Sequence, residues 1–354
     1  MNTFGRKLTL TTFGESHGAA IGGVIDGFPA GVRIDTRLLQ SELDRRRPGR
    51  NKFATARDEA DRAEILSGVF EGVSSGAPIA FVIFNQNQKS NDYENLREIF
   101  RPGHADFTYF KKFGVRDHRG GGRASARETA IRVAGGAFAQ MLLNEFGVSV
   151  KSGVLSIGDI VANEPDFDLA SKSEIYSLGN ENAMKSLIMK AREQHDSVGA
   201  SVLSVVDGAP AGLGEGLYYK LDAVLAAALM GINGVKAVEI GEGVNASRLF
   251  GSQNNDEMSE QGFLSNHAGG ILGGISTGER IVLKSHFKPT PSIFKAQKTQ
   301  NLNGECVEFE LRGRHDPCIG VRGSVVATAM IRLVICDMML LNLGSNLANL
   351  KKFY

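Results

Sequence analysis

The chain has no tryptophan and only three cysteines among its 354 residues. The cysteines (Cys306, Cys318 and Cys336) form no C-x-x-C pair and are odd in number, so the sequence indicates neither a disulfide framework nor a zinc site. We expect no bound metal. The net charge is +1, with 40 Lys and Arg against 39 Asp and Glu, whereas general nucleic-acid-binding proteins are usually strongly basic. Any positive field must therefore be local, and we expect no nucleic-acid partner.

Long apolar runs and targeting signals are also missing from the sequence. Residues 1–7, MNTFGRK, are not followed by the apolar stretch of a secretory signal. We find no apolar run that approaches the roughly 20 residues needed to cross a bilayer. With 42% hydrophobic and 22% charged residues, the composition is that of a globular protein. We therefore expect a cytoplasmic location and no membrane partner.

The apolar pattern predicts a mixed fold with substantial antiparallel sheet, because strands do not alternate strictly with helices. A hairpin is expected between 65–71 and 77–84, turning at 74–76. No linker divides the chain, so we expect a single domain over residues 1–354. Further strands are expected at 6–13, 200–206, 236–241, 281–287 and 306–311, and helices at 35–47, 219–230 and 322–342.

The most informative segment is residues 119–129, RGGGRASARET. Its glycines allow the backbone to approach a ligand, and Ser125 and Glu128 match the S-x-x-E capping box of a helix start. A helix N-terminus flanked by arginines suits an anion. The predicted helix runs from Ser125 to Gly147, with Gly135 and Gly136 allowing close packing. Its expected inward-facing residues are Ile131, Ala134, Phe138, Met141, Leu142 and Phe146.

Other loops carry groups that could do chemistry. Residues 14–18, GESHG, match the G-x-S-x-G of serine hydrolases, but they also place His17 as a general acid just after a strand. Residues 101–106, RPGHAD, offer a second histidine, His104. Residues 44–50 contain four arginines, whose forks suit phosphate and carboxylate. In residues 312–318 Asp316 could act as a base. These features favour an enzyme that acts on a phosphorylated anionic small molecule.

Several motifs, taken in order along nearly the whole chain, resemble those of the chorismate synthase family. They lie at residues 14–18, 26–31, 44–49, 101–106, 118–129, 265–271 and 313–318. The resemblance implies an α+β fold, a single β-α-β sandwich of antiparallel sheets covered by helices, and a homotetramer. It implies an anti-1,4 elimination of phosphate from 5-enolpyruvylshikimate 3-phosphate to give chorismate, which requires reduced FMN.

The resemblance also implies roles for the site residues. His104 would be the acid near the departing phosphate, and His17 would protonate the reduced flavin. Asp316 would relay a proton with Ser16 and Ser125. The substrate anions would be bound by Arg46, Arg101 and Arg127. The FMN would be lined by Arg123, Ala124, Ser125, Asn233, Gly234, Gly273, Lys288, Pro289, Thr290, Pro291, Ser292 and Arg314.

Two positions depart from the family pattern. Ala124 replaces a serine, so Ser125 is the hydroxyl left to serve the flavin. Arg46 and Lys52 match positions associated with NADP, which would act as NADPH to reduce the flavin, but Lys52 stands where an arginine is expected and lacks its fork. Two alternatives to the lyase remain open: a serine hydrolase using Ser16, and an anion-binding or RNA-binding protein using the arginine runs.

Overall fold

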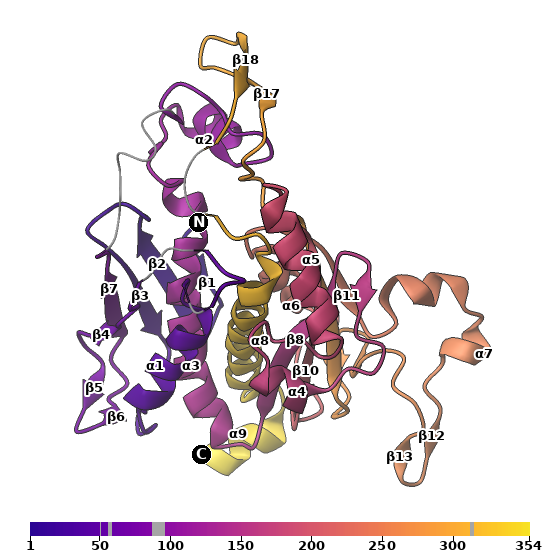
Figure 1. The fold of residues 1–354 in the computed structure, drawn as a ribbon. Coiled ribbons are helices and arrows are strands. Elements are labelled where there is room, and N and C mark those ends of the chain that lie inside the picture. The colour runs from indigo at the N-terminus through magenta and orange to yellow at the C-terminus, as the bar shows by residue number, and fades with distance from the viewer. Residues whose placement is uncertain (50, 56–58, 87–95, 312–314) are drawn as a thin grey trace.

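The computed structural model describes residues 1–49, 51–55, 59–86, 96–311 and 315–354. Its frame is a pair of five-stranded sheets in which all strand pairs are antiparallel, with helices between them (Figure 1). The predicted α+β class is therefore confirmed. The first sheet has the order β1 (Thr3–Phe4), β2 (Thr9–Gly14), β3 (Ala20–Asp26), β7 (Ile79–Phe84), β4 (Glu64–Ile65). The second has the order β11 (Val235–Ile240), β16 (Ile281–Phe287), β10 (Ala200–Asp207), β8 (Ser149–Ile157), β9 (Ile160–Val161).

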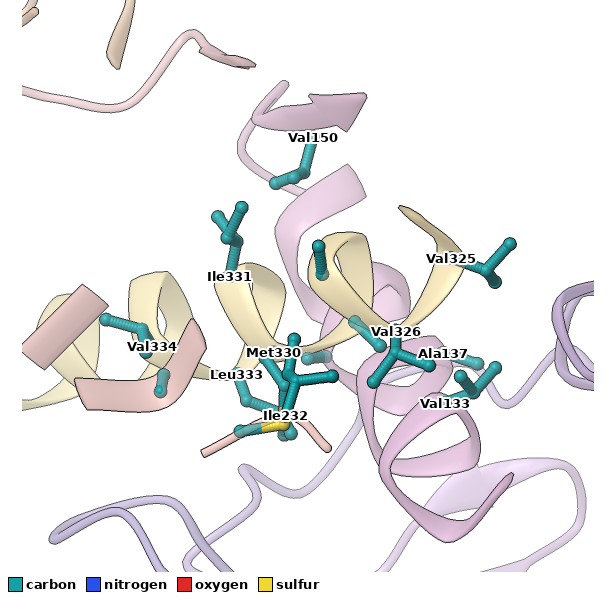
Figure 2. Packing of buried hydrophobic residues seen from close by; sticks show 14 of the residues in the cluster. Val133, Ala137, Val150, Ile232, Val325, Val326, Met330, Ile331, Leu333 and Val334 are labelled. Carbon is teal, nitrogen blue, oxygen red and sulfur yellow. The ribbon is translucent and has the colours of Figure 1, made fainter. Parts of the chain in front are cut away.

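The layer between the sheets is built from α1 (Thr36–Arg46), α3 (Thr129–Asn144), α6 (Leu221–Met230) and α8 (Gly320–Asn342). α3 lies against β2 and β3, and α8 lies against β8, β10 and β16. Val150 of β8 faces the side of α8 that carries Ile331 (Figure 2). Gly153 points the opposite way, towards Ala170 of α4 (Phe167–Lys172). α4 and α5 (Glu181–Glu193) therefore cover the outer face of β8.

The two central helices cross closely because α3 carries glycine at the contact. A Cβ added to Gly136 would lie 2.5 Å from the Cα of Ala329 in α8, and one added to Gly135 would lie 2.8 Å from Leu10. The expectation that this glycine pair allows close packing is confirmed. Around the crossing, Val133 and Ala137 of α3 pack with Val326 and Met330 of α8 (Figure 2).

The remaining described elements are short and lie mainly around the ends of the sandwich. Each of the small hairpins is a strand pair of its own: β5 (Val69–Phe70) with β6 (Val73–Ser74), β12 (Met258–Ser259) with β13 (Gly262–Phe263), β14 (Ile271–Leu272) with β15 (Ile275–Ser276), and β17 (Gln297–Gln300) with β18 (Cys306–Phe309). The short helices are α2 (Asp106–Phe113), α7 (Gly251–Asn254) and α9 (Leu347–Phe353), with 3-10 turns η2 (Gly122–Ala124), η3 (Ala126–Glu128) and η4 (Gly243–Arg248).

Most elements expected from the sequence are present, because local chain chemistry defines their ends. The Asp35 carboxylate accepts hydrogen bonds from the backbone N–H groups of Arg37 and Leu38, as an N-cap should. The strands expected at 200–206, 236–241, 281–287 and 306–311 match β10, β11, β16 and β18 to within a few residues. The helices expected at 219–230 and 322–342 match α6 and α8.

The predicted hairpin turn at 74–76 is wrong. β4 and β7 do pair antiparallel, but the chain between them forms the separate β5–β6 hairpin. That hairpin turns at Glu71 and Gly72, whose φ angles of 49° and 80° both lie in the left-handed region. Two left-handed residues match the twist of the flanking strands, so the tight turn forms there instead.

The expected helix start at Ser125 is also wrong. Ser125 accepts a hydrogen bond from the Arg127 N–H, but this closes the turn η3, and α3 begins at Thr129. The Glu128 carboxylate does not accept a hydrogen bond from the Ser125 backbone N–H, as a capping box requires. It pairs instead with Arg132 at 2.9 Å and accepts from the Thr12 hydroxyl at 3.1 Å. Phe146, expected to face inward, follows the end of α3 and is 61% exposed.

The expectation that no apolar segment has membrane-spanning length needs correction. α8 has 23 residues and is apolar enough to cross a membrane by length and composition. Its most apolar window is 83% buried inside the molecule, between α3 and the second sheet. α8 therefore has the surroundings of a core helix.

Candidate active site

A cavity of about 500 Å³ opens where loops from both halves of the sandwich meet. Its size is within the usual range for small-molecule sites. The described lining residues include a single carboxylate, Asp316, against seven cationic side chains. The cations are Arg46, Arg101, Arg123, Arg127, Arg132, Arg322 and Lys288. This local excess of positive charge, in a chain of net charge +1, suits a ligand with several negative charges.

The first wall is the loop that joins β2 to β3. It begins at Gly14, whose φ of 88° lies in the left-handed region. A side chain added at this position would collide with the carbonyl oxygen of Ala20. Ser16 and His17 follow, 1% and 5% exposed, with the Ser16 hydroxyl 3.1 Å from His17 Nδ1. The Asn85 amide, beyond β7, donates to the carbonyls on either side of this pair and holds the loop.

This topology is wrong for a nucleophile elbow. The G-x-S-x-G motif of serine hydrolases stands at a turn from a strand into a helix, whereas residues 14–18 join two antiparallel strands. The hydrolase alternative therefore lacks the backbone context that exposes its serine.

The glycine run in residues 120–122 separates two histidines. A Cβ added to Gly120 would lie 2.1 Å from His17 Cε1, and one added to Gly121 would lie 3.1 Å from His104 Cε1. All three glycines have φ values in the left-handed region. The backbone therefore contacts both imidazole rings directly, and no other residue type fits at Gly120 without moving His17.

The second histidine is held by a buried carboxylate. His104 Nδ1 lies 2.9 Å from Asp106 Oδ1, and Arg101 donates to Asp106 through Nε at 2.7 Å and Nη2 at 2.9 Å. Although burial alone would raise the pKa of Asp106, the hydrogen bonds from Arg101 and His104 hold it well below its usual range. Burial lowers the pKa of His104; the hydrogen bond and charge of Asp106 oppose this, and Arg101 and Lys288 lower the pKa further.

Two pocket arginines share one carboxylate. Asp61 accepts from Arg46 Nη1 at 2.8 Å and from Arg127 Nη1. Arg46 is fully buried and also donates to Ala126 O and Thr129 Oγ1, so each of its three donor nitrogens has a protein acceptor. Arg127 Nε donates to Asn85, but its Nη2 is buried without a hydrogen-bond partner in the described part of the chain. Arg127 therefore has a donor left for a ligand.

Another wall of the cavity is formed by the segment just before α8 and by the first turn of that helix. Asp316, 6% exposed, accepts from the Thr55 N–H at 3.1 Å and from Arg322 Nη2. Arg322 Nε and the neighbouring His315 Nε2 are buried with no partner among the described residues. Burial, with Arg101, lowers the pKa of His315 to about 4. The imidazole of His315 is therefore uncharged at neutral pH.

The structure gathers most residues singled out from the sequence at this cavity. Ser16 does not line it but hydrogen-bonds to His17, which does. The lining includes His17, Arg46, Arg101, His104, Arg123, Ala124, Ser125, Arg127, Asn233, Gly234, Lys288, Thr290, Pro291, Ser292 and Asp316.

A few expected site residues lie elsewhere. Pro289 is absent from the lining. Gly273 is in the turn between β14 and β15, and Lys52 is exposed, with its Nζ 5.3 Å from the Phe53 ring centroid. Arg314 lies outside the described residues.

Three basic side chains of the lining were not among the expected site residues: Arg132, His315 and Arg322. The sequence held a signal for Arg322. It stands in the first turn of α8, where the helix dipole disfavours a cation, so another interaction must hold it there. His315 and Arg132 carry no comparable local signal, because their importance depends on what packs against them.

Comparisons of the chain with family models, curated proteins and solved structures all point to one family. A family model described as chorismate synthase matches residues 8–340. The chain is 96% identical to a chorismate synthase of Campylobacter curvus and 75% identical to one of Campylobacter concisus, with all of both chains covered in each case. A crystal structure of chorismate synthase superposes with a TM-score of 0.77 at 31% identity, covering 99% of this chain and 96% of the other.

Proposed function

The chain belongs to the chorismate synthase family and is a carbon–oxygen lyase of the shikimate pathway, and we propose that the arginine-lined cavity is its active site. The observation that carries this proposal is the set of buried donors left open in a strongly cationic pocket. Arg127 Nη2 and Arg322 Nε have no described protein partner, and a buried unpaired donor costs about 1–3 kcal/mol. Such donors are retained when a ligand uses them.

The proposed substrate, 5-enolpyruvylshikimate 3-phosphate, matches this pocket in charge. It carries a phosphate and two carboxylates, and guanidinium groups bind both kinds of anion with charge-assisted hydrogen bonds. Arg101 and Arg127 are the proposed direct contacts, since both line the cavity. Arg46, whose donor nitrogens are all occupied, contributes its charge and holds Asp61 in place.

His104 is the proposed acid at the departing phosphate. Its Nδ1 faces Asp106, which leaves Nε2 to face a ligand and fixes the tautomer. In the free pocket, burial and neighbouring cations keep the pKa of His104 low. A bound phosphate opposes this lowering, because a negative neighbour favours the protonated ring. Substrate binding would therefore bring His104 to the charge state that can donate a proton.

The cavity also has the donor set for the proposed cofactor, FMN. Lys288, Thr290 and Ser292 lie in one turn of the wall, and Thr290 Oγ1 is buried without a described partner. The remaining proposed contacts on the cavity wall are Arg123, Ala124, Ser125, Asn233, Gly234 and Pro291. When bound, reduced FMN would supply the electron-rich group that assists loss of the substrate proton.

The protein groups near that cofactor would handle protons. His17 would hold a proton on its imidazole for the reduced flavin. The Ser16 hydroxyl lies 3.1 Å from Nδ1 of this imidazole. Asp316 is the proposed relay, together with Ser125, and its pairing with Arg322 keeps the carboxylate oriented. Gly273 and Pro289, which do not line the cavity, remain proposed cofactor contacts, and so does Arg314, which is outside the described residues.

We also propose that the whole chain works as one domain, in a cytoplasmic homotetramer. Arg46 and the exposed Lys52 match positions associated with NADP, and NADPH bound there is the alternative source of electrons for FMN. Because we see no separate reductase insertion, we propose that the enzyme depends on an outside reductant rather than reducing its own FMN.

An anaerobic assay with 5-enolpyruvylshikimate 3-phosphate and chemically reduced FMN tests the proposal. We expect phosphate and chorismate in equal amounts, and neither with oxidised FMN. His104→Ala should lose turnover by about 10²- to 10⁴-fold while still binding FMN. A parallel reaction with oxidised FMN plus NADPH separates self-reduction from an outside reductant. Folded protein that gives no product under reducing conditions would overturn the assignment of the cavity. Binding of RNA with steep salt dependence would then revive the nucleic-acid alternative.

A further inference from the structure

Buried polar atoms without described partners form a footprint on the cavity wall. They are Arg127 Nη2, Thr290 Oγ1, Arg322 Nε and His315 Nε2. The first two belong to the proposed substrate and cofactor contacts, and Arg322 is already engaged with Asp316 through its other nitrogen. His315 is the member of this footprint that has no role in the proposed reaction.

His315 differs chemically from the cations around it. Its ring stacks at a tilt against Phe294, with 5.9 Å between centroids, which restricts its orientation. Burial and Arg101 lower its pKa to about 4, against the opposite effect of Asp316, so it carries no charge at neutral pH. A neutral imidazole has one donor nitrogen and one acceptor nitrogen, whereas arginine and lysine have only donors.

We propose that His315 accepts a hydrogen bond from the free ring hydroxyl of the substrate and thereby selects for that hydroxyl. The inference rests on the proposed function of the cavity. Shikimate has three hydroxyl groups, of which one carries the phosphate and one the enolpyruvyl ether in this substrate. The third is a hydrogen-bond donor, and guanidinium and ammonium groups cannot accept from it.

This role explains why an uncharged ring stands in a wall of cations. The anionic groups of the substrate are matched by arginines, and a further charge at His315 would be repelled by Arg101. A substrate without the hydroxyl would leave the buried ring nitrogen without a partner, which is the situation in which a site discriminates most strongly.

The test compares the natural substrate with its analogue that has hydrogen in place of the free hydroxyl. We expect the unaltered enzyme to prefer the natural substrate by about 10- to 100-fold in kcat/KM. His315→Phe keeps a ring against Phe294 but has no acceptor, so the preference should fall to within about threefold. His315→Gln has an amide that can accept, and it should retain most of the preference. His315→Leu gives a second apolar variant if the phenylalanine does not fold.

The matched control is His195→Leu. His195 is exposed and contacts Phe294, with ring centroids 6.3 Å apart, but it does not line the cavity. This variant should keep the full preference for the hydroxyl. Folding of each variant is checked by thermal unfolding, and FMN affinity by fluorescence titration.

Two results would overturn the proposal. One is an unchanged hydroxyl preference in His315→Phe or His315→Leu when either variant turns over the natural substrate. The other is a loss of FMN affinity in these variants without a change in preference, which would reassign His315 to the cofactor. A failure of the proposed function is distinct from both, since the unaltered enzyme would then convert neither compound.

Discussion

Two buried aspartates, one in the core and one at the cavity, show how structural and ligand-binding polar groups differ. Asp337 on α8 is 1% exposed and accepts from the backbone N–H groups of Arg6, Lys7 and Leu8 and from the Tyr219 hydroxyl. Asp61 is also buried, but its partners are the guanidinium groups of two cavity arginines.

The difference lies in whether the donating residues keep a hydrogen-bond donor that has no partner in the protein. The described groups that donate to Asp337 are uncharged, and each makes its hydrogen bond within the protein. None of these residues lines the cavity. Arg127, which donates to Asp61, keeps a buried Nη2 with no described partner. In this pair, complete satisfaction goes with a group that holds the fold, and the open donor belongs to an arginine that lines the cavity. The variants below test this distinction.

Among these variants, the largest effect on turnover is expected from Gly120→Ala. An added Cβ would lie 2.1 Å from His17 Cε1, so the ring must move, and a shift of about 1 Å at a reacting group costs about 10²-fold in rate. Gly122→Ala is the matched control, because Gly122 also has a left-handed φ, of 53°, but its Cβ would meet nothing nearer than 3.8 Å. Steady-state kinetics with reduced FMN compares the two. Equal losses in both variants would show that backbone strain, not contact with His17, is responsible.

Arg127→Lys should lower kcat/KM by about 10- to 100-fold. The lysine keeps a positive charge beside Asp61 but has no second nitrogen for the ligand, and one charge-assisted hydrogen bond contributes about 1.5–3 kcal/mol. Arg280→Lys alters a surface Arg–Asp pair in the same way and should leave activity unchanged. If Arg127→Lys retains full activity, the open Nη2 does not serve the substrate.

Asp106→Asn should lower activity about tenfold and move its pH dependence. The carboxylate raises the pKa of His104, so removing it lowers that pKa further. An acid must be protonated to act, so kcat/KM falls as pH rises through this pKa, and the falling limb should move to lower pH. Asp117→Asn, which removes the half-buried carboxylate that pairs with the exposed Arg119, is the control. An unmoved limb would contradict the role given to His104.

The smallest effect on turnover is expected from Asp337→Asn. An amide places an N–H₂ group against donors that need an acceptor, so the free energy of unfolding should fall by about 1–3 kcal/mol. Because these groups lie outside the cavity, kcat/KM of the folded enzyme should change less than twofold. Urea unfolding and kinetics measure the two quantities. A large kinetic loss would break the contrast between Asp337 and Asp61.

Local chemistry explains which features could be predicted from the sequence. Asp35 begins α1 because its side chain reaches N–H groups two and three residues away. The apolar patterns of β10, β16 and α8 depend on neighbouring residues, so the sequence predicts these elements. The capping box predicted at Ser125 does not form, because Glu128 instead pairs with Arg132 and accepts a hydrogen bond from Thr12, which lies 116 positions away in the chain.

The candidate site divides in the same way. Residue identity and order are enough to indicate the family, the α+β class and the loops that carry the histidines and arginines. The three-dimensional arrangement is needed to show which arginine keeps an open donor, that Gly120 contacts His17 and that His315 is uncharged. These properties depend on burial and on partners distant in the chain, such as Thr55 and Asp316, which are 261 positions apart. Desolvation and hydrogen-bond satisfaction are set by three-dimensional packing, and no local pattern encodes them.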